Sequence, residues 1–350
     1  MSQEQIYSNV LVKVGVEKSH LLSEKKLERL ADCKNLTEFA SELRETIYGE
    51  ELAKVKSPFT SRVLERVFRE SLIEAVIKMV RSSPDVVSLF LKTYLLKFEY
   101  ENIKIILRAA SVGLSYDEIV NKIYLSVEEF LKRKELILKA TMAIQMKSVV
   151  DVLRPTVYEF SLISGLQKYE ETGSTKFFDI LLDKMFYEHL AERFKQLPTK
   201  EQELAFFYVS TETDMFNILT VLRAKLLGYE PNWVRMAITR NFYNVSEQTV
   251  ESILMAADFE SAFKIIKQSY YKNFFEKAET PEEVISNAEN VLRRKIFDHV
   301  TKTMIGDPFN VGTPITFILK KEIELYNLTA ICLGIEYNWK KDDISGLLLV

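Results

Sequence analysis

Hydrophobic residues recur at steps of three and four along most of the chain, the period of α-helices with one buried face. The clearest case lies between residues 64 and 80, where charged residues such as Glu65, Arg69 and Lys78 fill the opposite side. Its apolar positions are Leu64, Val67, Phe68, Leu72, Ala75, Val76, Met79 and Val80. The run Ser82-Ser83-Pro84-Asp85 predicts the end of this helix and the start of the next. Long alternating runs, typical of strands, are missing, so the sequence predicts an all-α protein.

Composition supports this fold class. Glycine occurs 10 times and proline 8 times in 350 residues, below the usual ~7% and ~5%. The hydrophobic fraction of 47% excludes wholesale disorder. Lysine plus arginine (47) and aspartate plus glutamate (50) nearly cancel, leaving a net charge of −3. Without a basic excess, we expect no nucleic-acid partner.

The two cysteines, Cys33 and Cys332, lie at opposite ends of the sequence. They predict neither a disulfide framework nor a metal site, and a reducing compartment suits them. No apolar run approaches the ~20 residues that cross a bilayer, and the first residues carry no apolar signal core. We therefore expect no direct membrane insertion; any association with a membrane would run through other proteins.

An internal repeat is the most informative feature. A first pattern consists of an apolar residue, a basic residue, any residue, a hydroxyl residue, an apolar residue or tyrosine, and a tyrosine. Its copies are Leu43–Tyr48, Leu153–Tyr158 and, more weakly, Ile266–Tyr271. Residue 153 follows residue 43 by 110 positions, and residue 266 follows by a further 113.

A second pattern follows each copy after 56, 61 and 58 residues. It has a carboxylate, an asparagine three residues later, apolar residues at helical spacing, then arginine and a small residue. The copies begin at Glu99, Asp214 and Glu324, with asparagines at 102, 217 and 327. Two short patterns in constant order indicate three homologous helical repeats, which we place at 1–115, 116–230 and 231–350.

The repeated residues allow two interpretations. Carboxylate and asparagine share a helix face, and they could form a charged groove for a partner or fix how helices pack. Repeated motifs usually report repeated architecture, so we favour packing. The small residues Ala109, Ala224 and Gly334 would permit close helix approach. Gly113 and Gly228 are expected to end their helices as C-caps.

Catalytic constellations are scarce. The histidines at 20, 189 and 299 are isolated from one another in sequence, and none belongs to a metal-binding helical pair. Asp179 and Asp183 lie one helical turn apart, as in half of a magnesium site, but a solvated helix face is favoured because lysines flank them. Gly306–Thr313 lacks the Gly-Lys-Ser/Thr ending of a phosphate-binding loop and predicts an inter-helix loop. We expect no catalytic, cofactor-binding or metal-binding residue.

With these patterns in place, the chain resembles the C-type subunits of archaeal-type (A/V-type) rotary ATPases, which are related to the d-type subunits of vacuolar ATPases. The resemblance covers nearly the whole chain, and its threefold order is its specific part. The segments that carry it are Tyr7–Asn9, Val12–Val14, Leu21–Ser23, Leu43–Gly49, Tyr94–Lys97, Asn102–Arg108, Asp214–Gly228 and Lys320–Asn327. The third copy departs from the other two in having Leu333 in place of arginine.

The resemblance implies three helical bundles in a pseudo-threefold, funnel-like arrangement. It implies a non-catalytic part of the central stalk that couples the stalk shaft (D- and F-type subunits) to the membrane rotor ring (c/K-type subunits). Such a part transmits torque for ATP-linked proton or sodium transport at the cytoplasmic face of the membrane.

Two other functions stay open. One is a soluble all-α scaffold that binds protein partners in a concave surface, although solenoids of that kind use repeats of only ~20–50 residues. The other is an all-α metalloenzyme built on Asp179 and Asp183, which would need a second carboxylate cluster.

Overall fold

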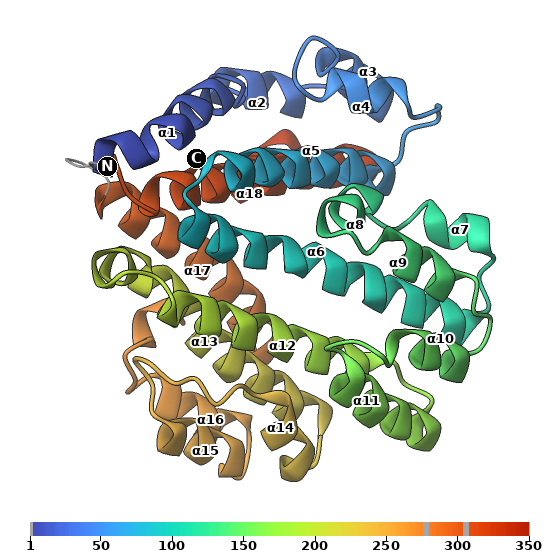
Figure 1. Ribbon diagram of the computed structural model, residues 1–350, viewed down its shortest axis with the longest axis vertical. Coiled ribbons are helices and arrows are strands. Elements are labelled where there is room, and N and C mark those ends of the chain that lie inside the picture. Colours follow the sequence, from blue (N-terminus) through green and yellow to red (C-terminus); the bar gives the residue numbers. More distant parts are fainter. Residues whose placement is uncertain (1–2, 276–279, 304–307, 350) are drawn as a thin grey trace. The chain divides into compact units, whose positions relative to one another are not determined.

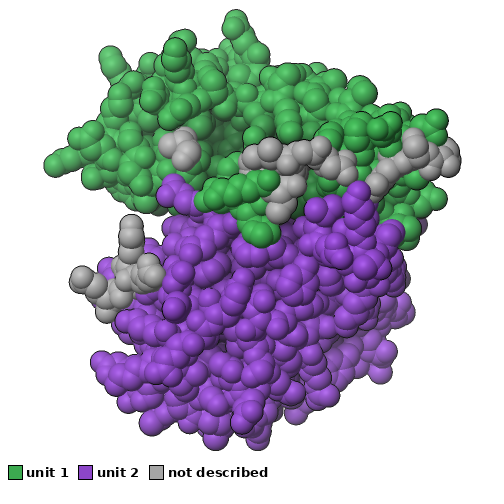
Figure 2. Space-filling model, turned by 90° about the vertical axis from the view of Figure 1, so that its left-hand side faces the viewer, with its two compact units in different colours: residues 1–91, 297–350 green, residues 92–296 purple. Residues whose placement is uncertain are grey.

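The computed structural model describes residues 3–275, 280–303 and 308–349. Within these ranges the chain is helical with no strand, which confirms the all-α prediction. Figure 1 shows the helices, and Figure 2 shows the two compact units into which the chain divides. Unit 1 contains residues 1–91 and 297–350, and unit 2 contains residues 92–296. Among the described helices, none has the length and hydropathy required to cross a bilayer.

Unit 1 is assembled from both ends of the chain. Its helices are α1 (Gln3–Ser19), α2 (Glu24–Ala31), α3 (Leu36–Glu42), α4 (Gly49–Ala53), α5 (Ser61–Ser82), α18 (Gly312–Glu336) and α19 (Lys341–Leu347). The first residues of α6 (Asp85–Val112) and the last residues of α17 (Pro281–Thr303) also belong to it. Helices α5 and α18 lie side by side and form its centre (Figure 1).

Unit 2 holds most of α6 and α17 and everything between them. The remaining helices are α7 (Tyr116–Val120), α8 (Leu125–Leu131), α9 (Lys134–Thr141), α10 (Met146–Leu153), α11 (Glu159–Thr172), α12 (Lys176–Lys195), α13 (Thr199–Leu227), α14 (Pro231–Ala237), α15 (Glu247–Met255), α16 (Phe259–Ile266) and the 3₁₀ turn Lys272–Phe274. The long helix α13 packs against both α12 and α15 (Figure 1).

The amphipathic pattern around residues 64–80 forms α5, and every apolar position predicted for its inner face is buried. The helix begins after the N-cap Thr60, whose side chain accepts the Val63 N–H, and ends at Ser82. Helix α6 begins at Asp85, as the Ser-Ser-Pro-Asp run predicted. Gly113 and Gly228 have φ of +72° and +68°, in the left-handed region that glycine adopts without strain, so both end their helices as predicted.

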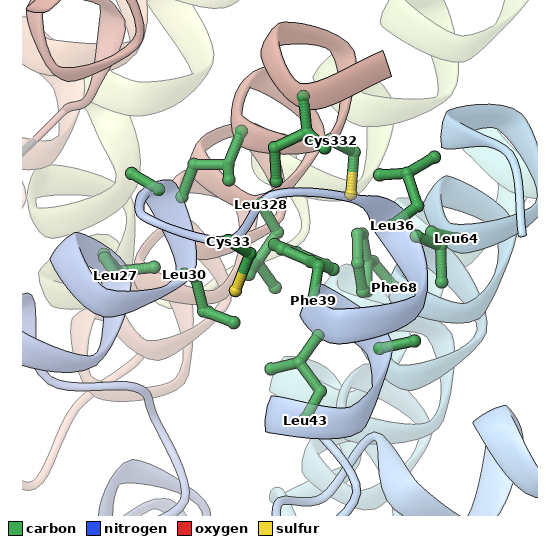
Figure 3. Close-up of a cluster of buried hydrophobic side chains, with 14 of the residues drawn as sticks. Leu27, Leu30, Cys33, Leu36, Phe39, Leu43, Leu64, Phe68, Leu328 and Cys332 are labelled. Carbon is green, nitrogen blue, oxygen red and sulfur yellow. The ribbon is translucent and has the colours of Figure 1, made fainter. Parts of the chain in front are cut away.

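The core of unit 1 joins residues that are far apart in sequence. Phe39 and Phe68 meet edge to face with ring centroids 6.3 Å apart, and Leu328 of α18 packs into the same cluster (Figure 3). Cys33 and Cys332 both lie in this cluster, and both thiols are free. Burial raises the pKa of Cys33 to about 11, so its thiol stays protonated and unreactive near neutral pH.

The loop predicted at Gly306–Thr313 lies only partly within the described residues. Gly306 and Asp307 lie outside them. Helix α18 begins earlier than expected, at Gly312, and includes Thr313 and Pro314 in its first turn. Proline is tolerated there because the first helical N–H groups need no intrahelical partner.

Close backbone approach at Gly49 provides a stability test. An added Cβ on Gly49 would lie 2.1 Å from the carbonyl oxygen of Arg44, a backbone atom that cannot swing aside. We expect Gly49→Ala to lower the free energy of unfolding by about 1–3 kcal/mol, measured by urea denaturation. Glu159 serves as the control, because it is the equivalent position in the second copy of the pattern and its side chain is exposed. Glu159→Ala should cost less than about 0.5 kcal/mol, and equal losses in both variants would contradict the prediction.

Candidate functional site

The three asparagines of the second pattern make the same contact three times. Each is at most 2% exposed and projects from a long helix (α6, α13 or α18). Each pairs with the backbone N–H and C=O of the residue 22 positions later. The pairs, with N···Oδ1 and Nδ2···O distances, are Asn102–Tyr124 (2.7 and 3.0 Å), Asn217–Thr239 (2.9 and 3.3 Å) and Asn327–Leu349 (2.8 and 3.0 Å).

This geometry follows from the chemistry of the amide side chain. A primary amide offers a carbonyl oxygen and an N–H group, so it can pair with the backbone N–H and C=O of one residue as a neighbouring strand would. Each helix is thereby fastened to the chain that follows it. A buried peptide segment needs such partners, because unpaired backbone groups cost free energy away from water.

The hydroxyl residue of the first pattern makes the same two hydrogen bonds in all three copies. Its hydroxyl donates to the carbonyl oxygen three residues earlier and accepts the N–H of the tyrosine two residues later. The hydroxyl residues are Thr46, Thr156 and Ser269, with tyrosine N–H distances of 3.3, 3.2 and 3.2 Å. The tyrosines, Tyr48, Tyr158 and Tyr271, are at most 1% exposed, so the hydroxyl turn holds each ring in the core.

The tyrosines meet the carboxylates of the second pattern, which creates three polar clusters. We call them cluster 1 (Glu99 and Tyr158), cluster 2 (Asp214 and Tyr271) and cluster 3 (Glu324 and Tyr48). Each cluster joins the second pattern of one copy to the first pattern of another copy. Clusters 1 and 2 lie in unit 2, and cluster 3 lies in unit 1.

A guanidinium neutralises the carboxylate of cluster 1. Arg133 Nη1 lies 2.6 and 2.8 Å from the two Glu99 oxygens and 2.5 Å from the Tyr158 hydroxyl. Glu128 is fully buried nearby and accepts from Asn102 Nδ2 at 2.7 Å through Oε1. Its Oε2 has no hydrogen-bond partner among the described residues. Burial, and secondarily the charge of Glu99, raise the pKa of Glu128 to about 8.

Cluster 2 uses backbone N–H groups instead of a cation. Asp214 accepts from the N–H groups of Tyr243 (3.0 Å) and Asn244 (2.7 Å) and from the Tyr271 hydroxyl (2.9 Å). Asn244 Nδ2 also donates to Tyr271 at 3.1 Å. Burial raises the pKa of Asp214, and the backbone hydrogen bonds only partly oppose this shift.

In cluster 3 an ammonium group is the partner of the carboxylate. Lys321 Nζ, on a side chain 1% exposed, lies 2.6 Å from both Glu324 Oε1 and the Tyr48 hydroxyl. Tyr48 donates to the same Glu324 oxygen at 2.5 Å, and the Leu22 N–H donates to Oε2 at 2.5 Å. Burial lowers the pKa of Lys321, while Glu324 opposes that shift. The cluster therefore ties residues 22 and 48 to α18.

The arginines of the second pattern pair with acidic residues on other helices. Arg108 Nη2 lies 3.0 Å from Asp179 of α12, and Arg223 bonds Glu289 of α17. The third copy has Leu333 here. Gly334 beside it allows α19 to approach closely, because a Cβ there would lie 2.4 Å from the Ile344 side chain. The predicted role of this small residue in close packing is confirmed for Gly334.

Asp179 does not lie on the predicted solvated face, whereas Asp183 is partly exposed. The Asp179 side chain is only 23% exposed, because it packs under Arg108. Asp183 is 45% exposed and bonds Lys104 Nζ at 2.5 Å. Both carboxylates thus connect α12 to α6. Across the described ranges, no group of three or more His, Cys, Asp or Glu side chains is placed to hold a metal.

The histidines remain scattered. His20 and His299 are exposed. His189 is half-buried, stacks on Tyr100, and its Nδ1 lies 2.6 Å from the Tyr100 hydroxyl. Burial lowers the pKa of His189, which favours its neutral form in this contact.

Clusters 1, 2 and 3 hold helices together, in agreement with the packing interpretation of the repeated residues.

Comparison with known proteins gives this architecture a family. The profile of the ATP synthase (C/AC39) subunit family matches residues 10–347. The chain belongs to this family. Its relatives include three archaeal proteins, each named as the C-type subunit of an A-type ATP synthase. The protein of Methanocaldococcus jannaschii is 27% identical over 98% of this chain and 86% of its own length. That of Methanothermobacter thermautotrophicus is 25% identical (93% and 82% covered), and that of Pyrococcus furiosus is 24% identical (93% and 85%).

Membership confirms the resemblance inferred from the repeated patterns. Glu128 and Arg133 belong to neither repeated pattern, whereas Lys321 lies three residues before the repeated Glu324. Arg133 is the middle residue of the short basic run Lys132-Arg133-Lys134. It is the internal partner of Glu99. Only spatial proximity to a repeated carboxylate distinguishes it from its two neighbours.

The asparagine contacts of this C/AC39 family member predict a graded loss of stability. Asn102→Ala and Asn217→Ala should each lower the free energy of unfolding by about 2–4 kcal/mol, because each leaves a buried N–H and C=O unpaired. Asn327→Ala should cost less, about 1–2 kcal/mol, since Leu349 is half-exposed and water can replace the amide.

Urea denaturation measures these losses, with Asn9→Ala as the control. Asn9 is exposed on α1, so its loss should stay within about 0.5 kcal/mol. Losses at Asn102 and Asn217 no larger than at Asn9 would refute the structural role of the amide contact.

Glu128 predicts a pH dependence of stability. Its pKa is about 8 in the folded chain and ~4.3 in unfolded peptides. The neutral carboxyl therefore supports folding fully below the lower value, and this contribution is lost as the pH rises through about 8. From about pH 5 to about pH 9 the wild type should lose about 2–4 kcal/mol more than Glu128→Gln does.

The adjacent Glu129 offers a matched control, because its side chain is 57% exposed. Glu129→Gln should keep the pH dependence of the wild type. If chemical denaturation at both pH values gives the same difference for Glu128→Gln and the wild type, Glu128 is ionised in the folded chain.

Proposed function

We propose that this chain is a central-stalk rotor subunit that couples the stalk shaft to the membrane rotor ring of an A/V-type ATPase. The family match over residues 10–347 is the observation that carries the proposal. The proposed partners are the D- and F-type shaft subunits and the c/K-type ring subunits. The proposed location is the cytoplasmic face of the membrane, reached through these partners.

The proposal extends to the arrangement of the chain. The repeats 1–115, 116–230 and 231–350 would form three lobes around one axis, as a funnel that receives the tip of the shaft. Support comes from the recurrence of the asparagine contact at a constant interval of 22 residues in all three copies. Equivalent internal contacts favour equivalent lobes.

A coupling part must be stiff rather than reactive. The long helices α6, α13 and α18 contain 28, 29 and 25 residues, and each is fastened along its length by buried polar contacts. Packed interiors have low compressibility and transmit strain. Under this proposal the chain itself carries out no chemistry, and ATP turnover belongs to other subunits.

The test compares the complex with and without this chain. We expect removal to leave ATP hydrolysis largely intact and to abolish ATP-driven ion transport into proteoliposomes, because shaft and ring lose their connection. Adding back the purified chain should restore transport, and the chain should co-purify with both shaft and ring subunits. The proposal fails if coupled transport continues at its full rate without the chain. It fails equally if the chain is absent from an otherwise intact complex, as a free scaffold would be.

A further inference from the structure

A cavity of about 370 Å³ lies within unit 2 and is lined mainly by residues of helices α12, α13 and α14. Its volume falls in the range of small-molecule sites, which usually have apolar walls and a few polar groups at defined positions. The polar clusters described above do not line it, so their packing role does not account for it. The coupling function proposed above does not require it either.

Aromatic rings form much of the cavity wall. Tyr187 of α12 and Phe216 of α13 stack with centroids 4.4 Å apart. Phe177 contacts Tyr229 and Trp233 at centroid distances of 5.3 and 5.4 Å. An aromatic lining favours a planar apolar guest, which gains contact area against the rings.

Two carboxylates line the cavity, and each forms an ion pair inside the protein. Arg108 binds Oδ2 of Asp179 and Lys104 binds Oδ1 of Asp183, while Asp179 Oδ1 has no hydrogen-bond partner among the described residues. Burial raises the pKa of Asp179, while Arg108 and Lys104 oppose that shift. A cationic guest would therefore meet carboxylates whose negative charges are already balanced by Arg108 and Lys104.

Three basic side chains line the same cavity. Lys97, Lys176 and Arg223 are all exposed. Arg223 has a carboxylate neighbour, Glu289, whereas Lys176 begins helix α12 at the edge of the aromatic wall. The charge left available to a guest is therefore positive.

We propose that this cavity binds an organic anion with a planar aromatic body and one acidic group. The rings of Tyr187, Phe216 and Trp233 hold the body, and the ammonium group of Lys176 attracts the acidic group. The ligand class thus follows from an apolar aromatic interior combined with a basic edge.

Two fluorescent probes with the same aromatic skeleton test this assignment. Anilinonaphthalene sulfonate is an aromatic anion, and N-phenylnaphthylamine has the same skeleton without the sulfonate. The chain has two tryptophans, so Trp339→Phe, at a side chain 44% exposed in unit 1, leaves Trp233 as the sole donor for energy transfer. Binding is measured on the full folded chain as sensitised probe emission on excitation of Trp233.

We expect saturable binding at one site, with the sulfonate probe held more tightly than the neutral probe. Lys176→Glu should weaken sulfonate binding by about three- to tenfold and leave the neutral probe unchanged. Lys147→Glu, an equal charge reversal at an exposed position on α10, should change neither probe.

Three results would overturn the proposal. The first is a lack of energy transfer from Trp233, which would place any bound probe elsewhere. The second is equal affinity for the two probes. The third is an equal effect of Lys176→Glu and Lys147→Glu on sulfonate binding, which would reduce the charge effect to the net charge of the chain.

Discussion

The buried asparagine in the middle of a long helix is the constraint on which this structure depends. An amide side chain at 0–2% exposure must find both a donor and an acceptor. In α6, α13 and α18 it finds them in the backbone N–H and C=O of one residue, 22 positions further along the chain. That choice fixes where the chain must return after each long helix, and the short helices that follow pack within the loop so defined.

The three carboxylates beside these asparagines show how far a repeated contact can diverge while its geometry persists. One is met by a guanidinium, one by backbone N–H groups and one by an ammonium group. Buried ion pairs add little net stability compared with apolar packing, because desolvation offsets much of the attraction. Their constant position suggests selection for one defined arrangement of helices, which suits a part proposed to transmit force.

Much of the fold could be read from the sequence, for identifiable reasons. The period of apolar residues defined α5, and glycine at positions 113 and 228 marked helix ends, because both signals are local. The repeat identified the asparagines, the tyrosines and their structural role. The repeat did not predict that each carboxylate pairs with a tyrosine from another copy, since this pairing depends on the three-dimensional path of the chain.

The sequence also failed to predict the surroundings of two charged residues, again because these depend on how the chain packs in space. Asp179 was assigned to a solvated face because the lysines near it in sequence were visible, whereas Arg108 lies 71 residues away. Lys321 is three residues from Glu324 and could have been paired with it. It is only 1% exposed, and its ammonium group also donates to Tyr48, which lies 273 residues earlier in the chain. Sequence patterns report faces of helices, while burial of a charge depends on what packs over the face.

The discontinuity of unit 1 has a consequence for biosynthesis. Residues 92–296 leave the ribosome as one uninterrupted stretch and can fold as soon as they are complete. Phe39 and Tyr48, by contrast, are translated early but must wait for Leu328 and Glu324 before their side chains are covered. During that interval the nascent N-terminal segment exposes apolar surface of the kind that chaperones bind. Synthesis of α18 is therefore the step that ends its exposure.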